Sequence, residues 1–139
     1  MGASAWLNVD RPVSSTPTVY IDLAKVDRME LPERFELTTI TLAELQQGVA
    51  LAKEATARDD RGKRLRAAIA GYYPLPFDRR ASARFGSLVG LTIAAGRDPR
   101  SRKFDLMIAA IASSNDLPLY TRNPKDFVGL EELVEVVEV

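Results

Sequence analysis

The hydrophobic pattern is densest between residues 103 and 126. No polar side chain occurs from Leu106 to Ala112, so a helix here must contact apolar groups on both of its sides. Asn115 and Asp116 form a turn signal, after which residues 117–121 have the length and composition of a short buried strand. A helix that leads into a core strand through a tight turn is the second half of a βαβ unit in a parallel sheet.

The rest of the chain alternates between strand-like and helix-like segments. Strands are predicted over residues 35–40 and 133–139, and the glutamates of the second indicate an edge of the sheet. A short extended segment is predicted over residues 73–77. Three further helices are predicted. The helix over 41–55 has an inner face of Leu42, Leu45, Val49 and Ala52, and the helix over 58–73 has one of Leu65, Ala68 and Ile69. The helix over 81–95 is expected to end at Gly96. Residues 18–26 fit either a strand or a helix. This alternation predicts an α/β fold, a three-layer α/β/α sandwich on a mainly parallel sheet.

Size and composition narrow the possible chemistry. The 139 residues are enough for one domain, which we place at 18–139, after a loop or disordered lead over 1–17. No apolar run approaches the roughly 20 residues of a membrane span, and the start does not resemble a secretory signal, so we expect a cytoplasmic protein without a membrane partner. The absence of cysteine excludes disulfides, thiolate catalysis and cysteine-bound zinc. The absence of histidine removes the commonest general base and the commonest transition-metal ligand. Carboxylates that bind Mg²⁺ or Mn²⁺ are the remaining obvious chemistry.

Charge is segregated although the net charge is zero. Residues 78–103 hold seven basic side chains against two acids, and residues 126–139 hold five acids and no base. A basic middle segment can present a local phosphate-binding surface. It can equally be the solvated face of a helix.

Four polar residues are predicted to gather at one edge of the sheet. In a parallel α/β fold, each helix that follows a strand begins at the carboxyl edge, where ligand sites lie. Glu44 follows the strand predicted over 35–40, Asp105 begins the central helix, and Asn123 and Asp126 follow the strand at 117–121. Clustered carboxylates repel one another, and a divalent cation is the usual compensation.

Each of these residues also has a purely structural interpretation. Thr41 and Glu44 have the spacing of a capping box, in which the glutamate satisfies a backbone N–H. Asp105 could be a favourable anion at a helix start, and Asn123 before Pro124 is ordinary turn chemistry.

Three blocks of sequence, residues 40–49, 103–110 and 117–127, together resemble the PIN-domain toxins of the VapC type. The similarity extends over roughly residues 18–139. It implies an α/β/α sandwich in which acidic residues hold Mg²⁺ or Mn²⁺ and cleave RNA. It also implies a toxin that is neutralised by a cognate VapB-type antitoxin and that forms a homodimer.

The resemblance assigns roles to the candidate residues. Glu44 matches the second acid of the family and Asp105 the third, while Asn123 stands in the position of the fourth, with Asp126 three residues later. In a ribonuclease of this kind we expect the basic side chains of the preceding loop to flank the RNA and to bind it with an affinity that falls with salt; these are Arg97, Arg100, Arg102 and Lys103.

The start of the chain departs from the family pattern. Thr16 stands where the first acid is expected. Asp22 would replace that acid if residues 19–21 form the first strand, and Asp10 would do so if residues 6–9 form it. The leading hypothesis is therefore a metal-dependent ribonuclease, and the alternative is a catalytically impaired PIN-like domain that only binds antitoxin or RNA. A nucleotide-binding domain is disfavoured because no glycine-rich phosphate loop follows any predicted strand.

Overall fold

The structure is a computed structural model that describes residues 19–20 and 36–138. The expectations for residues 1–17 and for Asp10, Thr16 and Asp22 lie outside the described residues, as does most of the ambiguous segment 18–26. In chain order the elements are β1 (Val19–Tyr20), α2 (Thr39–Leu51), α3 (Ala55–Gly71), α4 (Arg79–Ala94), the 3₁₀ helix η2 (Pro99–Arg102), α5 (Lys103–Ser114), β2 (Leu119–Thr121), the 3₁₀ helix η3 (Pro124–Phe127) and β3 (Val136–Glu138).

The sheet is parallel, and its strand order reverses beside β1. β1 pairs with β2, and β2 pairs with β3, with Val19 opposite Leu119. Single parallel bridges from Val19 to Glu36 and from Thr38 to Leu75 continue the pairing on the other side of β1. Along the chain, the extended segments after β1 are therefore added on one side of it, and β2 and β3 on the other. Such a reversal is where α/β proteins place ligand sites, at the carboxyl ends of the strands.

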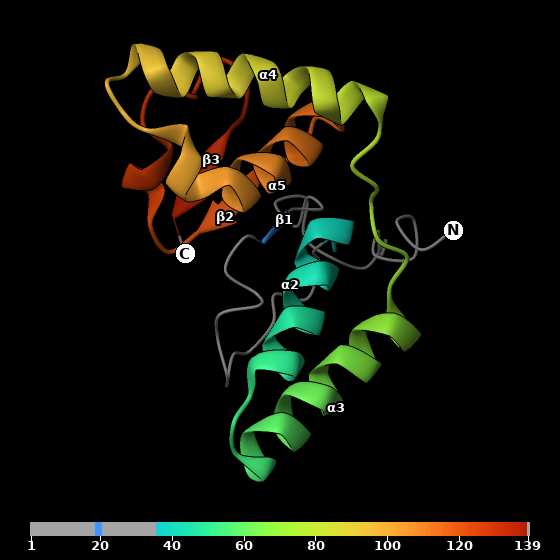
Figure 1. Ribbon diagram of the computed structural model, residues 1–139. Helices are drawn as coiled ribbons and strands as arrows, with labels where there is room; N and C mark the ends of the chain where they lie inside the picture. Colours follow the sequence, from blue (N-terminus) through green and yellow to red (C-terminus); the bar gives the residue numbers. More distant parts are fainter. Residues whose placement is uncertain (1–18, 21–35, 139) are drawn as a thin grey trace.

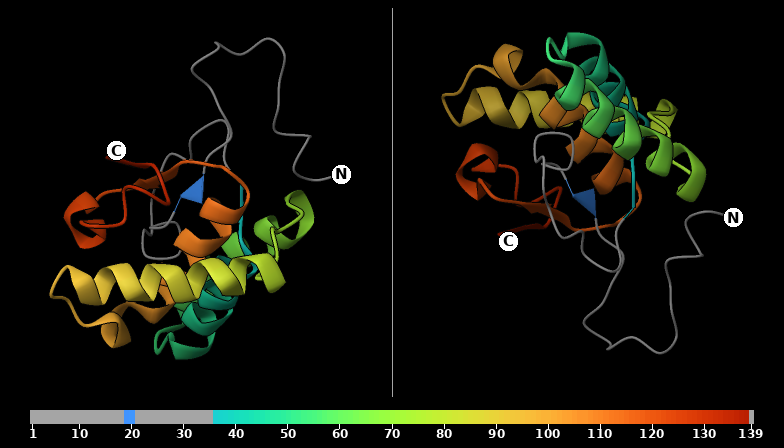
Figure 2. Two further views of the ribbon diagram at one scale, coloured as in Figure 1. Left: turned by 90° about the horizontal axis from the view of Figure 1, so that it is seen from above. Right: turned by 90° about the horizontal axis from the view of Figure 1, so that it is seen from below.

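Helix α5 lies between the sheet and α4, as Figures 1 and 2 both show. Leu106 and the run Ile108–Ala112 are at most 1% exposed. All of them except Ile111 belong to the larger core, together with Val19 and Leu119 of the sheet and Leu88 of α4. The apolar run predicted to be a helix buried on both sides is therefore confirmed, as is the α/β sandwich on a parallel sheet.

Helices α2 and α3 form a hairpin with a second, smaller core (Figure 1). Leu37, Leu45 and Ala68 are its buried members, and Tyr120 of β2 packs against it. Because successive residues of a strand face opposite sides of the sheet, Tyr120 contacts this core while Leu119 lies in the larger one.

The strand predicted over residues 35–40 extends too far in the prediction, which is wrong for residues 39 and 40 because α2 begins at Thr39. The Thr38 hydroxyl oxygen accepts a hydrogen bond from the Thr41 N–H at 3.0 Å, which is N-cap geometry. A local cap thus overrides the β-branched composition, and only the bridges of Glu36 and Thr38 remain from the predicted strand. The predicted segment at 73–77 likewise reduces to one bridge at Leu75.

The other helices differ from the prediction mainly at their ends. α2 stops at Leu51 and α3 begins at Ala55, three residues earlier than predicted. Ile69 was expected on the inner face of α3, and this is wrong, since it is 55% exposed. The smaller core contains Ala68 of α3, and Leu65 of α3 and Tyr72, just after its end, pack against it. Ile69 directly follows Ala68 and is therefore turned about 100° away from it around the helix axis.

Gly96 ends α4 as predicted. Its φ of 79° is left-handed, its N–H donates to Ile93 O, and the Arg97 N–H donates to Thr92 O at 3.1 Å. This pair of bonds is a Schellman motif, which is commonly closed by glycine. The strand expected at 133–139 is present but shorter, as β3 at one edge of the described sheet. None of the helices within the described ranges is both long and apolar enough to cross a membrane.

Candidate functional site

Glu44 and Asp105 line the same open cleft, although they are 61 residues apart in the chain, counting 105 minus 44. Glu44 comes from α2, which follows the extended segment 36–38, and Asp105 comes from the first turn of α5. The cleft has a volume of about 330 Å³. Its other lining residues are all from η2 and the start of α5: Arg100, Ser101, Arg102, Lys103 and Phe104.

The capping interpretation of Glu44 is excluded by the way α2 begins. Thr38, not Thr41, is the N-cap, and it takes the Thr41 N–H itself. Glu44 therefore lies beyond the first turn, too far along the helix to close a capping box with this N-cap. Its half-buried side chain lines the cleft instead.

Asp105 is in the first turn of α5, where the helix dipole favours a negative charge. Such an exposed or partly exposed interaction contributes roughly 0.5 kcal/mol. The structural interpretation of Asp105 therefore holds, but it does not conflict with a role in binding. Asp105 is half-buried and lines the same cleft as Glu44 of α2.

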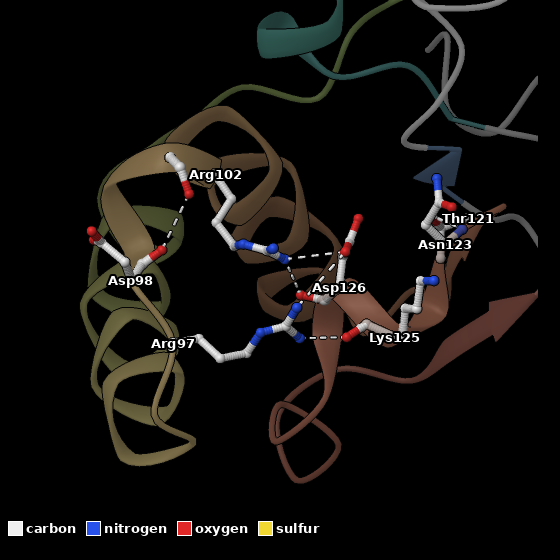
Figure 3. A network of polar contacts seen from close by, with 8 residues as sticks. Arg97, Asp98, Arg102, Thr121, Asn123, Lys125 and Asp126 are labelled. Atoms are coloured by element: carbon white, nitrogen blue, oxygen red, sulfur yellow. Dashed lines mark hydrogen bonds and ion pairs between the residues drawn. The ribbon is translucent and has the colours of Figure 1, made fainter.

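Asp126 is held by two arginines beside the cleft rather than on its wall (Figure 3). Its Oδ1 lies 3.6 Å from Arg102 Nη1 and 3.8 Å from Arg97 Nη2. The same arginines donate to the backbone of η3: Arg102 to Asp126 O at 2.6 Å, and Arg97 to Lys125 O. These contacts tie η3 to the connection between α4 and α5. Because Arg102 also lines the cleft, it links Asp126 to the pair formed by Glu44 and Asp105.

Asn123 lies at the carboxyl end of β2 but is not among the residues that line the cleft. Its backbone N–H donates to the Thr121 hydroxyl at 3.0 Å, and its side chain is exposed. Figure 3 shows it beside Thr121, apart from the arginine contacts of Asp126. The structure thus brings two of the four predicted site residues into one cleft, joins Asp126 to it through Arg102, and leaves Asn123 outside its lining.

The four basic residues expected to flank RNA differ in whether they already bind other groups of the protein. Arg97 and Arg102 are bound to η3 as described above. Arg100 donates to both carboxylate oxygens of Asp98 at 3.1 Å, and these hydrogen bonds hold the pKa of Asp98 below its ordinary value. Lys103 is exposed and makes no hydrogen bond or ion pair with any other residue in the described ranges. It is therefore the lining cation most available for an external anion.

The oxygen donors of the cleft suit a hard divalent cation. Mg²⁺ is commonly held by one or two carboxylates, with water and substrate phosphate completing its coordination. Glu44 and Asp105 supply such a pair. Within residues 19–20 and 36–138, no group of three or more acidic side chains is close enough to form a larger metal site. Asp22, the conditional substitute for the first acid, lies outside the described residues.

Phe104 is a cleft residue that the sequence reasoning did not consider. It is 48% exposed, which is unusual beside a helix as buried as α5. A signal was present in the sequence: Phe104, Ile108 and Ile111 have i, i+4, i+7 spacing and so share one face of the helix. The apolar stripe therefore continues past the core into the cleft.

Comparison with known proteins places this arrangement in a family, although no protein-family model matches the chain. Ribonuclease VapC5 of Mycobacterium tuberculosis is 35% identical over 117 residues, which are 83% of this chain and 84% of that protein. The crystal structure of VapBC-5, a member of the VapBC family of toxin–antitoxin systems from the same organism, matches with a TM-score of 0.76 and 29% identity over 89% of this chain and 99% of the other. FitAcB from Neisseria gonorrhoeae matches with a TM-score of 0.62 and 30% identity, over 84% and 83% of the two chains.

Proposed function

The chain belongs to the VapC family of PIN-domain toxins, and on that premise we propose that it is the toxin of a type II toxin–antitoxin module and cleaves RNA in a reaction that depends on Mg²⁺ or Mn²⁺. The observation that carries the proposal is the meeting of Glu44 and Asp105 in one cleft beside a basic segment. These are the two acids that the family resemblance also selects. When bound, the cation would lower the pKa of a coordinated water and stabilise charge on the phosphate.

The side chains of the cleft have distinct tasks in this proposal. Glu44 and Asp105 offer carboxylate oxygens to the cation from two elements whose relative position is fixed by packing. Lys103 contributes affinity for the RNA backbone, in a manner that weakens with salt. Asp126 keeps Arg102 and Arg97 directed towards η3, so its role in catalysis is to position Arg102 rather than to bind the cation.

The test is cleavage of RNA with Mg²⁺ or Mn²⁺ by the wild type, Asp105→Asn and Glu44→Gln. We expect both variants to lose cleavage, and a matched change in an exposed acid outside the cleft, Asp60→Asn on α3, to leave it intact. Calorimetric titration of Mg²⁺ should show binding that Asp105→Asn removes. Equal cleavage by the wild type and Asp105→Asn would contradict catalysis at this site.

The proposed partner is a VapB-type antitoxin, and the proposed assembly includes a homodimer of the toxin. The support is the structural match to VapBC-5, whose family is that of toxin–antitoxin systems. Co-expression with a VapB-type antitoxin, followed by co-purification and mass measurement, tests both expectations. A toxin that remains monomeric and does not co-purify would contradict them.

The alternative function is a PIN-like domain that binds antitoxin or RNA without cleaving it. One observation favours it: the described residues contain no cluster of three acids. This alternative predicts that the wild type binds RNA but shows neither metal-dependent cleavage nor calorimetric Mg²⁺ binding. Metal binding that is lost in Glu44→Gln would count against it.

A further inference from the structure

The cleft is lined by an aromatic ring as well as by carboxylates. Phe104 and Lys103 are the first two residues of α5 after η2, and both line the cleft that contains Asp105. Phe104 leaves 48% of its surface exposed. About half of its surface is therefore covered by the rest of the molecule, and the other half is open to contact.

Helix periodicity relates the ring to the buried residues of α5. Phe104 shares its helix face with Ile108 and Ile111, both of which are fully buried in the molecule. Phe104 is thus the end of a buried apolar stripe, at the point where the core gives way to the cleft. The lining of the cleft therefore combines two carboxylates, Glu44 and Asp105, with an aromatic ring and an adjacent ammonium group.

We propose that Phe104 stacks on an unpaired base of the RNA substrate while Lys103 contacts a neighbouring phosphate, so that these two residues position the RNA beside Glu44 and Asp105. This inference rests on the proposed ribonuclease function and adds two substrate-positioning residues to it. The same arrangement of an aromatic platform beside a cation is how many proteins bind single strands without reading their sequence.

The chemistry of the ligand follows from the geometry of stacking. A base within a duplex has both faces covered by its neighbours, and the major groove of A-form RNA is too deep and narrow for side chains to read. A base in a loop or a single strand exposes its face to an aromatic ring. Arg100 and Arg102 are already engaged with Asp98 and Asp126, which leaves Lys103 as the principal phosphate contact next to the ring.

Binding measured without divalent metal separates recognition from cleavage. The ligands are a fluorescein-labelled single-stranded RNA and a duplex of the same sequence, titrated in EDTA and followed by fluorescence anisotropy. We expect Phe104→Ala to weaken binding of the single strand by about 5- to 150-fold, the range for loss of one stacked base. Binding of the duplex should be unchanged, and Phe104→Trp should bind the single strand at least as tightly as the wild type.

Two controls keep the result specific to the ring. Phe104→Leu retains apolar bulk and packing but offers no aromatic face, so it should bind the single strand as weakly as Phe104→Ala. Tyr73→Ala removes an aromatic residue that is 68% exposed but does not line the cleft, and it should have no effect. A 2-aminopurine base in the RNA should be quenched by the wild type and by Phe104→Trp but not by Phe104→Leu.

The outcomes also separate this inference from the proposed function. Wild-type affinity in Phe104→Ala and Phe104→Leu would overturn it, even if Asp105→Asn abolishes cleavage. An equal loss for single strand and duplex would also overturn it. Loss of antitoxin binding in Phe104→Ala with RNA binding intact would make the ring a protein contact instead. If the wild type cleaves no RNA but binds the single strand through Phe104, only the catalytic proposal fails.

Discussion

Replacing Glu36 by glutamine should change how the stability of the fold depends on pH. Glu36 is only 4% exposed, and its bridge partner Val19 is fully buried in the larger core. Among the described residues, its Oε1 has no hydrogen-bond partner. Burial raises the pKa of Glu36 from 4.5 to about 7, because the charged form loses its hydration.

The sign and size of the effect follow from linkage. Below the unfolded-state pKa of 4.5 the side chain is neutral in both states and causes no destabilisation. As pH rises to about 7 and beyond, unfolding becomes more favourable because the carboxylate ionises more readily in the unfolded chain. The difference between the two pKa values corresponds to a loss of about 3 kcal/mol in the free energy of unfolding at high pH.

The assay is urea unfolding, followed by circular dichroism, of the wild type and Glu36→Gln at about pH 5 and about pH 8. Glutamine does not titrate, so the variant should gain stability relative to the wild type between these pH values, by about 2 to 3 kcal/mol. Glu135→Gln, at an exposed position before β3, is the matched control and should follow the wild type. Parallel pH dependence of the wild type and Glu36→Gln would refute the reasoning.

Three further changes test other parts of the structure. Thr38→Ala removes the N-cap of α2 and its 2.9 Å hydrogen bond to the Thr41 hydroxyl, and urea unfolding should show a loss of about 1 to 2 kcal/mol, whereas Thr38→Ser should lose less. Gly96→Ala should cost about 1 kcal/mol in thermal or urea unfolding, because the φ of 79° disfavours a side chain although a Cβ there meets no atom within 4 Å; an unchanged midpoint would contradict this. Lys103→Gln should reduce the salt dependence of RNA binding by about one counterion, with a smaller change for Arg100→Gln, because that arginine is already paired; equal slopes for both would contradict the difference in engagement.

Two features of the site were readable from the sequence because they depend on local pattern. The run from Leu106 to Ala112 has no polar side chain, and this alone requires a helix that is buried on both sides. Because this helix connects two parallel strands, it begins at the carboxyl edge of the sheet, and Asp105 lies in its first turn. Gly96 likewise marks a helix end through its own backbone preference, which needs no partner elsewhere in the chain.

Other features depended on contacts between residues distant in the chain. The order of strands and helices in the sequence predicted that Asp126 would lie with Glu44 and Asp105. In the structure, Arg97 and Arg102 hold its carboxylate beside the cleft. Those arginines were read as cations for RNA, since the sequence does not show which acid a long side chain reaches.

The sequence by itself determined the alternating elements, the buried central helix and the edge of the sheet at which the acids begin, because periodicity and backbone preference act within a few residues. Only the tertiary structure decided which of those polar groups meet. Glu44 and Asp105 share a cleft because α2 and α5 pack beside one parallel sheet, and Phe104 faces it because the core ends there. Ion pairs and clefts arise from the packing of whole elements, and the one-dimensional pattern does not specify that geometry.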